Sequence, residues 1–369
     1  MIWKVRYIDY PKHYQKLRRQ ILALVDDVLT RGDVMLRQQL RDFETNLAKF
    51  VGTKYAVGMS NCTDALHLTL RAVGIGAGDE VVTVSHTFVA TVAAIKHTGA
   101  TPILVDIGDD HNMNVELLEK AISPRTRAIV PVHLNGRLCE MEKLMAIARK
   151  RDLLVIEDTA QALGGSLNER KGGNWGLAGC FSFYPAKLLG AYGDAGAVVT
   201  SSEKLAEKLR SLRDHGRTPE GNISGWSFNC RMDNLHAAIL DLKLREVPQW
   251  IERRRQIANR YHQSLSSLTK LRLPPPNSDN RYFDVFQNYE IEAEDRDRLR
   301  VYLQENGIET LLPWGGRAVH QFEALGLTQF RLPRTEKMFE RALMLPMHCE
   351  LEDEQIAFVA QTVRRFYQN

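Results

Sequence analysis

Short apolar runs alternate with amphipathic stretches through the first half of the chain. Six β-rich runs recur between about residues 56 and 200, namely EVVTVSH (80–86), TPILVDI (101–107), TRAIVPVHL (126–134), LLVIEDTA (153–160), CFSFYP (180–185) and AGAVVT (195–200). Residues 114–122 show the helical pattern between them, with Asn114 as the expected N-cap. Apolar strands separated by helices are typical of a mostly parallel sheet that is buried on both faces. The pattern therefore predicts a three-layer α/β/α domain.

The pattern changes after residue 200. Long charged helices are predicted at 203–213 and 233–265, with Pro248 as a kink or break in the second. The prolines at 274–276 open a segment with the short strand FQNYEIEA and two more helices, at 295–306 and 352–367. We therefore expect a large domain over residues 1–250 and a smaller α+β domain over residues 251–369, with the N-terminal 30 or so residues able to pack on the small domain.

Composition narrows the class of protein. The chain has 369 residues, of which 44% are hydrophobic and 25% charged, and its net charge of +4 comes from residues of both signs scattered along the chain. These values are ordinary for a globular protein and give no reason to expect a nucleic-acid partner. The five cysteines lie far apart and form no C-x-x-C pair, so neither a disulfide framework nor a metal site is expected. No signal-peptide core or apolar stretch of membrane-spanning length is present, and we expect a cytoplasmic protein.

Two polar segments carry residues of the kind expected where ligands bind in α/β sheets, beyond the carboxyl ends of the strands. The segment 60–64 (SNCTD) precedes a helix, whose free N–H groups would bind a phosphate together with the Thr63 hydroxyl. Asp158 ends the run LLVIED, and its charge would keep a pyridine nitrogen protonated. Each segment is also explained by ordinary helix capping.

Two further segments carry candidate chemistry. Lys187 lies between apolar residues and near glycines, where burial would lower its pKa and make it a nucleophile and a base. Ser182, five residues earlier, would reach the same phosphate. Phe88 follows EVVTVSH and would stack on a planar ring, although a core phenylalanine is the commoner explanation. The combination of the four segments favours pyridoxal 5′-phosphate (PLP) as a cofactor.

The chain resembles the sugar aminotransferases of the DegT/DnrJ/EryC1/StrS family almost from end to end. The matching segments are Phe43-Glu44, SNCTDAL, SHTFVATVAAI, IEDTAQALGG, FSFYPAKLLGAYGDAGAVVT, LRDHG, FNCRMDNLHAAIL and LPMH. The resemblance implies the type I fold of PLP-dependent transferases, that of aspartate aminotransferase, with PLP as the cofactor. It also implies cofactor-binding roles for eight residues: Lys187 as the Schiff-base lysine, Asp158 as the partner of the pyridine nitrogen, Gln161 beside the ring hydroxyl, Phe88 as the stacking ring, Thr63, the backbone of Asp64 and Ser182 at the phosphate, and Asn229 at the phosphate of the partner subunit.

The sequence departs from the family pattern at three places. Cys62 stands where the family usually has glycine in the phosphate turn. The segment 313–316 (PWGG) replaces a His-Tyr pair, which puts the substrate contacts of that loop in doubt. Arg37-Gln38 replaces a Gly-Pro near the sugar site, so that Arg37 either contacts a substrate phosphate or is solvated.

The resemblance implies transfer of an amino group from an amino acid, with L-glutamate as the expected donor, to a keto group of a dTDP-, UDP- or GDP-linked deoxysugar. It also implies a homodimer with shared active sites. A PLP-binding regulatory or non-aminotransferase member of the family is the alternative. A related sugar dehydratase is disfavoured because such enzymes replace the lysine with histidine, whereas this chain has Lys187. The nucleotide, the sugar and the position of its keto group are left open.

Overall fold

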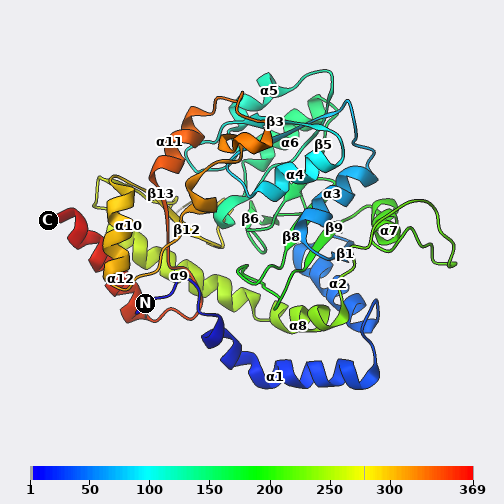
Figure 1. Cartoon of the computed structure of the whole chain (residues 1–369), viewed down its shortest axis with the longest axis horizontal. Coiled ribbons are helices and arrows are strands. Elements are labelled where there is room, and N and C mark those ends of the chain that lie inside the picture. The colour runs from blue at the N-terminus through cyan, green and yellow to red at the C-terminus, as the bar shows by residue number, and fades with distance from the viewer. Residues whose placement is uncertain (1–2, 278, 369) are drawn as a thin grey trace.

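The computed structural model describes residues 3–277 and 279–368, and its centre is a seven-stranded sheet (Figure 1). Of these seven described strands, β9 alone is antiparallel to its neighbours, which confirms the mostly parallel sheet. In spatial order the strands are β1 (Tyr55–Met59), β9 (Gly196–Thr200), β8 (Ala178–Ser182), β5 (Leu154–Asp158), β4 (Thr126–Ile129), β2 (Glu80–Val84) and β3 (Thr101–Val105).

Successive residues of a strand point to opposite faces of the sheet, and helices bury both of these faces. Val81 and Ala128 pack on one side, whereas Val82 and Ile129 pack on the other. The first side is covered by α3 (Cys62–Ala72), α4 (Val89–His97) and α7 (Glu203–Leu212). The second side is covered by α2 (Gln38–Val51), α5 (Leu118–Ala121), α6 (Met141–Lys150) and α8 (Asn234–Leu244). The predicted three-layer architecture is confirmed.

A second, antiparallel sheet belongs to the C-terminal part of the chain. Its strands are β10 (Leu271–Arg272), β12 (Tyr289–Ala293) and β13 (Ala342–Leu345). The helices α9 (Val247–Leu265), α10 (Arg296–Glu305) and α12 (Asp353–Gln368) pack on it around a core that includes Tyr261, Leu303 and Val359. A small third sheet joins β11 (Tyr282–Phe283) to the hairpin of β6 (Ser166–Leu167) and β7 (Arg170–Lys171). Among the described residues, no helix combines the length and the apolar character that a membrane span requires.

Helix α9 connects the two parts and runs without interruption through residue 250. Pro248 lies in its first turn, where the missing N–H costs no helical hydrogen bond, and the predicted break separates α8 from α9. A division of the chain at residue 250 stays a prediction.

The N-terminal segment contacts both parts of the molecule. The backbone N–H groups of Lys4 and Val5 donate to the Gly307 carbonyl, which attaches the first residues to the C-terminal part. Helix α1 (Tyr10–Arg31) lies instead against α8, below the large sheet in Figure 1. The first turn of α1 also contacts the C-terminal part, because Lys12 pairs with Glu352 at 2.6 Å and His13 with Glu350 at 2.9 Å. The packing of the first 30 residues on a separate small domain stays a prediction.

Most of the predicted elements are present, and the differences have local causes. The stretch 114–122 forms a 3₁₀ turn, η1 (Val115–Leu117), followed by the single turn of α5, and the Asn114 side chain caps it by accepting from the Glu116 N–H at 3.1 Å. Strand β1 was not predicted, because Gly58 interrupts its apolar pattern. A Cβ at Gly58 would come within 2.8 Å of Leu40, so the close packing of α2 explains the glycine. Helix α11 (Pro333–Arg341) and β13 were not predicted either.

Candidate active site

A cavity of about 740 Å³ lies at the carboxyl ends of the parallel strands. Its lining includes residues that end or follow four strands: Asn61, Cys62 and Thr63 after β1, Thr87 and Phe88 after β2, Asp158 and Gln161 at and after β5, and Ser182 and Lys187 at and after β8. Six of the eight predicted site residues therefore line one cavity, namely Thr63, Phe88, Asp158, Gln161, Ser182 and Lys187.

The N-terminus of α3 forms one end of the cavity. Asn61 caps the helix by accepting a hydrogen bond from the Asp64 N–H at 2.8 Å, and Thr63 lies in the first turn. The first N–H groups of a helix have no intrahelical acceptor, and the helix dipole makes this end positive. A Cβ at Gly196 of β9 would lie 2.6 Å from the Cys62 nitrogen, so only glycine lets the turn sit this close to the sheet. The turn keeps its anion-binding geometry although Cys62 replaces the usual glycine.

Lys187 lies in the loop after β8, and the backbone on both sides of it is held by one side chain. Gln287 accepts from the Leu188 N–H at 2.7 Å and donates to the Ala186 carbonyl at 2.9 Å. Burial lowers the pKa of Lys187, and the neighbouring charge of Asp158 opposes this shift in part. A lysine with a lowered pKa is a usable nucleophile and base.

Asp158 ends β5 with its carboxylate in the cavity and is only 5% exposed. Thr91 donates to one oxygen at 2.7 Å, and the Ala160 N–H donates to the other at 3.2 Å. Burial raises the pKa of Asp158, whereas the hydrogen bonds and the Lys187 charge lower it. A cationic ring nitrogen beside this carboxylate would favour the charged form of both groups.

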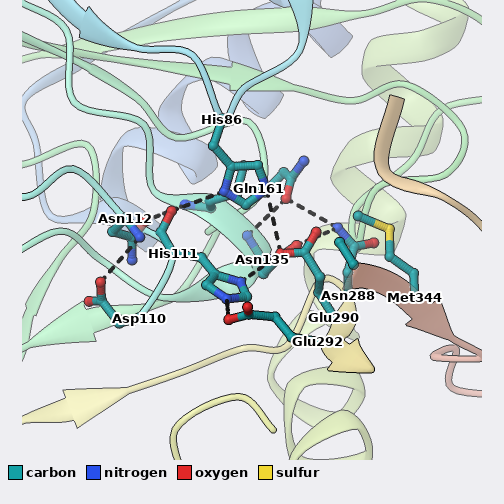
Figure 2. A network of polar contacts seen from close by, with 12 residues as sticks. His86, Asp110, His111, Asn112, Asn135, Gln161, Asn288, Glu290, Glu292 and Met344 are labelled. Carbon is teal, nitrogen blue, oxygen red and sulfur yellow. Dashed lines mark hydrogen bonds and ion pairs between the residues drawn. The ribbon is translucent and has the colours of Figure 1, made fainter. Parts of the chain in front are cut away.

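Gln161 and Phe88 supply the remaining contacts for a planar ring. The Gln161 side-chain oxygen accepts from the Asn135 N–H at 2.9 Å and from the Asn288 amide at 3.2 Å, so its NH₂ group is left for the cavity (Figure 2). Phe88 lies in extended conformation directly before α4 and is 56% exposed, as a stacking ring rather than a core residue would be.

The other two predicted site residues and Arg37 do not line this cavity. The Asp64 carboxylate accepts from Ser60 and Asn61, and its N–H is taken by the Asn61 cap, so a phosphate contact through that N–H requires the cap to move. Asn229 is exposed and pairs with Asp214 in an isolated β-bridge. Arg37 is exposed, and its N–H donates to Asn234 at 3.1 Å. The role predicted for Asn229 belongs to the cavity of a partner subunit, with which its exposure is compatible.

The segment that replaces the family's His-Tyr pair does reach the cavity. Trp314 lines it in a left-handed conformation, with φ of 45°, and its ring packs edge-on against His86 at 5.3 Å. Together with other apolar residues it forms a wall opposite the sheet, made of Leu311, Leu312, Pro313, Trp314, Met344 and Met347.

Several cavity residues were not found by sequence reasoning. Tyr7 and Glu309 are 302 positions apart, yet the Tyr7 N–H donates to the Glu309 carboxylate at 2.9 Å inside the cavity wall. No local sequence pattern indicates this pairing. Gln287 and Asn288 had a signal, because two consecutive amides stand within the predicted strand FQNYEIEA, directly before β12. Tyr10 also lines the cavity and was not predicted.

The donor set fits PLP. A helix N-terminus and the Ser182 hydroxyl suit its phosphate, a buried carboxylate suits its ring nitrogen, and the Gln161 NH₂ group suits its ring oxygen. Lys187 supplies an amine at the same cavity. Gly196 supports this fit, since a Cβ there would collide with the backbone of Asn61 and Cys62 and displace the turn at the anion-binding end.

The chain is similar to known proteins along nearly its whole length. A family model described as the DegT/DnrJ/EryC1/StrS aminotransferase family matches residues 15–364. The chain is 38% identical over 369 residues to the pleiotropic regulatory protein of Geobacillus stearothermophilus, covering 99% of both chains. It is also 38% identical over 359 residues to UDP-N-acetyl-3-dehydro-alpha-D-glucosamine 3-aminotransferase of Acidithiobacillus ferrooxidans, covering 97% of this chain and 96% of the relative. The X-ray structure of S. venezuelae DesV in complex with a ketimine intermediate superposes with a TM-score of 0.95 at 37% identity and covers 99% of each chain. The chain therefore belongs to the DegT/DnrJ/EryC1/StrS aminotransferase family.

Proposed function

We propose that this chain is a PLP-dependent aminotransferase that moves an amino group from an amino acid, with L-glutamate as the donor, onto a keto group of a nucleotide-linked deoxysugar. The observation that carries the proposal is that Lys187, whose pKa burial lowers, and the buried carboxylate of Asp158 line one cavity with an anion-binding helix N-terminus. The relative from A. ferrooxidans is named for an amino transfer to a UDP-linked sugar, which supports the substrate class.

Two side chains would carry the proton chemistry. Bound PLP would supply an electron sink for the charge left when a Cα proton departs. The Lys187 nitrogen, whose pKa burial lowers, would accept the proton from the donor's Cα and deliver it to the C4′ carbon of the cofactor. The Asp158 carboxylate would hold a proton on the ring nitrogen by its charge. The amination of the keto sugar reverses the same proton movements.

The other cavity residues would bind and orient the cofactor. Thr63, the Asp64 backbone and Ser182 would hold the phosphate, Phe88 would stack on the ring, and Gln161 would donate to its oxygen. In a homodimer, the exposed Asn229 would reach the phosphate in the partner's cavity.

The wall opposite the sheet would receive the sugar. Its apolar side chains, from Leu311 to Trp314 and at Met344 and Met347, suit the carbon-rich face of a deoxysugar and would exclude water. Glu309 adds one carboxylate to this wall and would accept a hydrogen bond from a sugar hydroxyl.

The proposal is tested by following the visible absorption of the PLP-loaded protein. L-Glutamate should remove the absorption band and release 2-oxoglutarate, and a nucleotide-linked 3-keto or 4-keto sugar from a panel should restore the band. A purely regulatory protein, as the name of the G. stearothermophilus relative suggests for that protein, would bind PLP and keep its band in glutamate. Such a stable band would overturn the proposed function.

A further inference from the structure

Four buried ionisable side chains lie beside the cavity, between the large sheet and the C-terminal sheet. His86 follows β2, His111 follows β3, and Glu290 and Glu292 lie two residues apart on β12, so their side chains share one face of that strand (Figure 2). Each of the four is at most 9% exposed. We call these residues the Glu290 cluster. None of them lines the cavity.

The cluster is a network of charges. His111 lies between the two carboxylates, with Nδ1 2.8 Å from Glu290 and Nε2 2.9 Å from Glu292. Burial by itself would lower the pKa of His111, but the hydrogen bonds and charges of the two glutamates raise it to about 9. The His86 Nε2 atom is 3.4 Å from Glu290, and the two histidines hold the pKa of Glu290 below its usual range although burial opposes this. Glu290 is therefore an ionised, hydrogen-bond-accepting group at neutral pH.

Hydrogen bonds of defined direction lead from Glu290 to Gln161. An ionised carboxylate only accepts, so the Asn135 side chain presents its NH₂ group to Glu290, at 3.0 Å, and its oxygen to the Asn288 amide, at 2.9 Å. The Asn135 N–H and the Asn288 NH₂ group both donate to the Gln161 oxygen. Each amide in this path is therefore oriented, and the last of them has only its NH₂ group left for the cavity.

Two residues that contact Glu290 have an unfavourable backbone conformation. Asn135 has φ of 56° and His111 has φ of 67°, both in the left-handed region that most side chains avoid. Such conformations persist only where surrounding contacts hold them. The Asn135 N–H reaches Gln161 from this conformation, so whatever holds the Asn135 side chain also fixes Gln161.

We propose that Glu290 is a positioning residue that, by holding Asn135, fixes the Gln161 amide with its NH₂ group toward the ring oxygen of bound PLP. The proposal rests on the proposed function, because it takes PLP to be the occupant of the cavity. Glu290 itself touches neither cofactor nor substrate.

The test compares Glu290→Leu with Glu292→Leu in the PLP-loaded full-length protein. Leucine is close to glutamate in size and offers no acceptor to Asn135. Both residues bind His111 and both lie on β12, but of the two only Glu290 hydrogen-bonds to Asn135 in the described part of the chain. The readout is the pH midpoint at which the visible absorption changes as the cofactor-linked Lys187 nitrogen loses its proton. A donor to the ring oxygen draws charge away from this nitrogen and favours proton loss. Losing the donor in Glu290→Leu should therefore raise the midpoint by about one pH unit.

The Glu292 variant is the control that distinguishes the loss of the contact to Asn135 from the loss of a negative charge. Removing a nearby negative charge would by itself lower the midpoint, so electrostatics and positioning predict opposite signs. Glu292→Leu should leave the midpoint unchanged or lower it, while both variants lose thermal stability because both weaken the contacts of His111. A midpoint that falls in Glu290→Leu, or that moves equally in both variants, would overturn the proposal.

A second variant tests the path through Asn135 and serves if Glu290→Leu does not fold. Asn135→Gly accepts the left-handed backbone and cuts only the side-chain link. It should raise the midpoint, and the double variant should show no more than the larger single shift, because the residues act in series. An unchanged midpoint in Asn135→Gly, or additive shifts, would contradict the path. Failure of the proposed function would look different, because the wild-type protein would then bind no PLP or Lys187→Ala would keep the linked band.

Discussion

The two walls of the cavity are built in different ways. The wall on the sheet side, with Thr63, Phe88, Asp158, Ser182 and Lys187, comes from turns that end or follow parallel strands. The opposite wall comes from three segments that are remote in the sequence, represented by Tyr7, by Glu309 to Trp314, and by Met344 and Met347. Strand ends fix the first wall locally, whereas the second depends on how the N-terminal and C-terminal parts pack.

This difference suggests that the two walls have different roles in the reaction. The sheet wall holds the two groups that proton transfer would need: Asp158 is buried and hydrogen-bonded to Thr91, and Lys187 has a pKa that burial lowers. The opposite wall is largely apolar, with Glu309 as a carboxylate in it. Variants of the sheet wall should therefore damage both halves of the reaction, whereas variants of the opposite wall should affect the sugar half alone. The predictions below test this contrast.

The largest effect is expected for Lys187→Ala. The variant lacks the amine that would attach the cofactor and move the Cα proton, so activity with every amino donor and sugar should be abolished. Borohydride treatment followed by mass spectrometry should show cofactor attached to the wild-type chain and none attached to the variant. Covalently attached cofactor in the alanine variant would refute the assignment.

Asp158→Asn should also impair both half-reactions while the protein stays folded. The asparagine keeps the size of the side chain but removes the charge that would hold the ring nitrogen protonated. Single-turnover rates with glutamate and with the sugar should each fall by roughly a hundredfold or more. Near-normal rates would show that the carboxylate has no such role, and circular dichroism should confirm that the fold is retained.

The sequence was informative about the sheet wall for a physical reason. Most of the buried strands are visible as apolar runs, and the chemistry-bearing residue stands within a few positions of the strand end, as Asp158 does in LLVIED. The carboxyl ends of parallel strands meet at one edge of a sheet, so local positions also predicted which residues would come together. Lys187 and Asp158 share the cavity for this reason. Thr63 follows β1, which was not predicted, and was found from its place before a helix.

The opposite wall could not be predicted in this way. Tyr7 meets Glu309 because the N-terminal segment pairs with the chain at Gly307, a contact that neither local sequence encodes. Trp314 enters the cavity from a left-handed turn beside two glycines, and the segment had been recognised only as a departure from the family pattern. Buried polar contacts such as Glu290 with His111 also need the tertiary structure, because the partners are 179 positions apart.

If the active sites of a dimer are shared, the partner subunit supplies residues to each cavity in addition to the two walls. Asn229→Ala should be clearly impaired, because its predicted contact is with the phosphate in the partner's cavity. If Asn229→Ala and Lys187→Ala chains are mixed equally and exchange, half the dimers become mixed, and each regains one intact site. Activity should then recover to about a quarter of wild type, given random pairing. A mixture no more active than the mean of its parents would rule out the shared site.

Glu309→Gln should show a smaller and one-sided effect. The glutamine can still accept from the Tyr7 N–H, but it loses the charge that would strengthen a hydrogen bond to a sugar hydroxyl. The KM for the sugar should rise by about tenfold, as expected for one charge-assisted hydrogen bond, with the glutamate half-reaction unchanged. An equal change in both half-reactions would contradict the division between the two walls.

The smallest effect is expected in the pH dependence of stability, and it concerns the contact between the two walls. The folded protein raises the pKa of His111 from 6.5 to about 9, so this group contributes stability that is fully present below pH 6.5 and is lost as the pH rises through about 9. His86, Glu290 and Glu292 face it, and Arg334 and Arg272 lie against Glu292.

Urea unfolding of the wild-type protein and of His111→Gln at pH 7, 8, 9 and 10 should separate this contribution from other groups that titrate in the same range. Cysteines, tyrosines and lysines titrate in both proteins, so the informative quantity is the difference between the two free energies of unfolding. That difference should shrink by on the order of 2 kcal/mol between pH 7 and pH 10, because the wild-type protein loses an advantage that the variant never had. A constant difference would mean that His111 keeps its proton throughout or carries no charge at neutral pH. In either case, the loss of a proton from His111 would not account for the stability of the contact between β12 and the sheet wall.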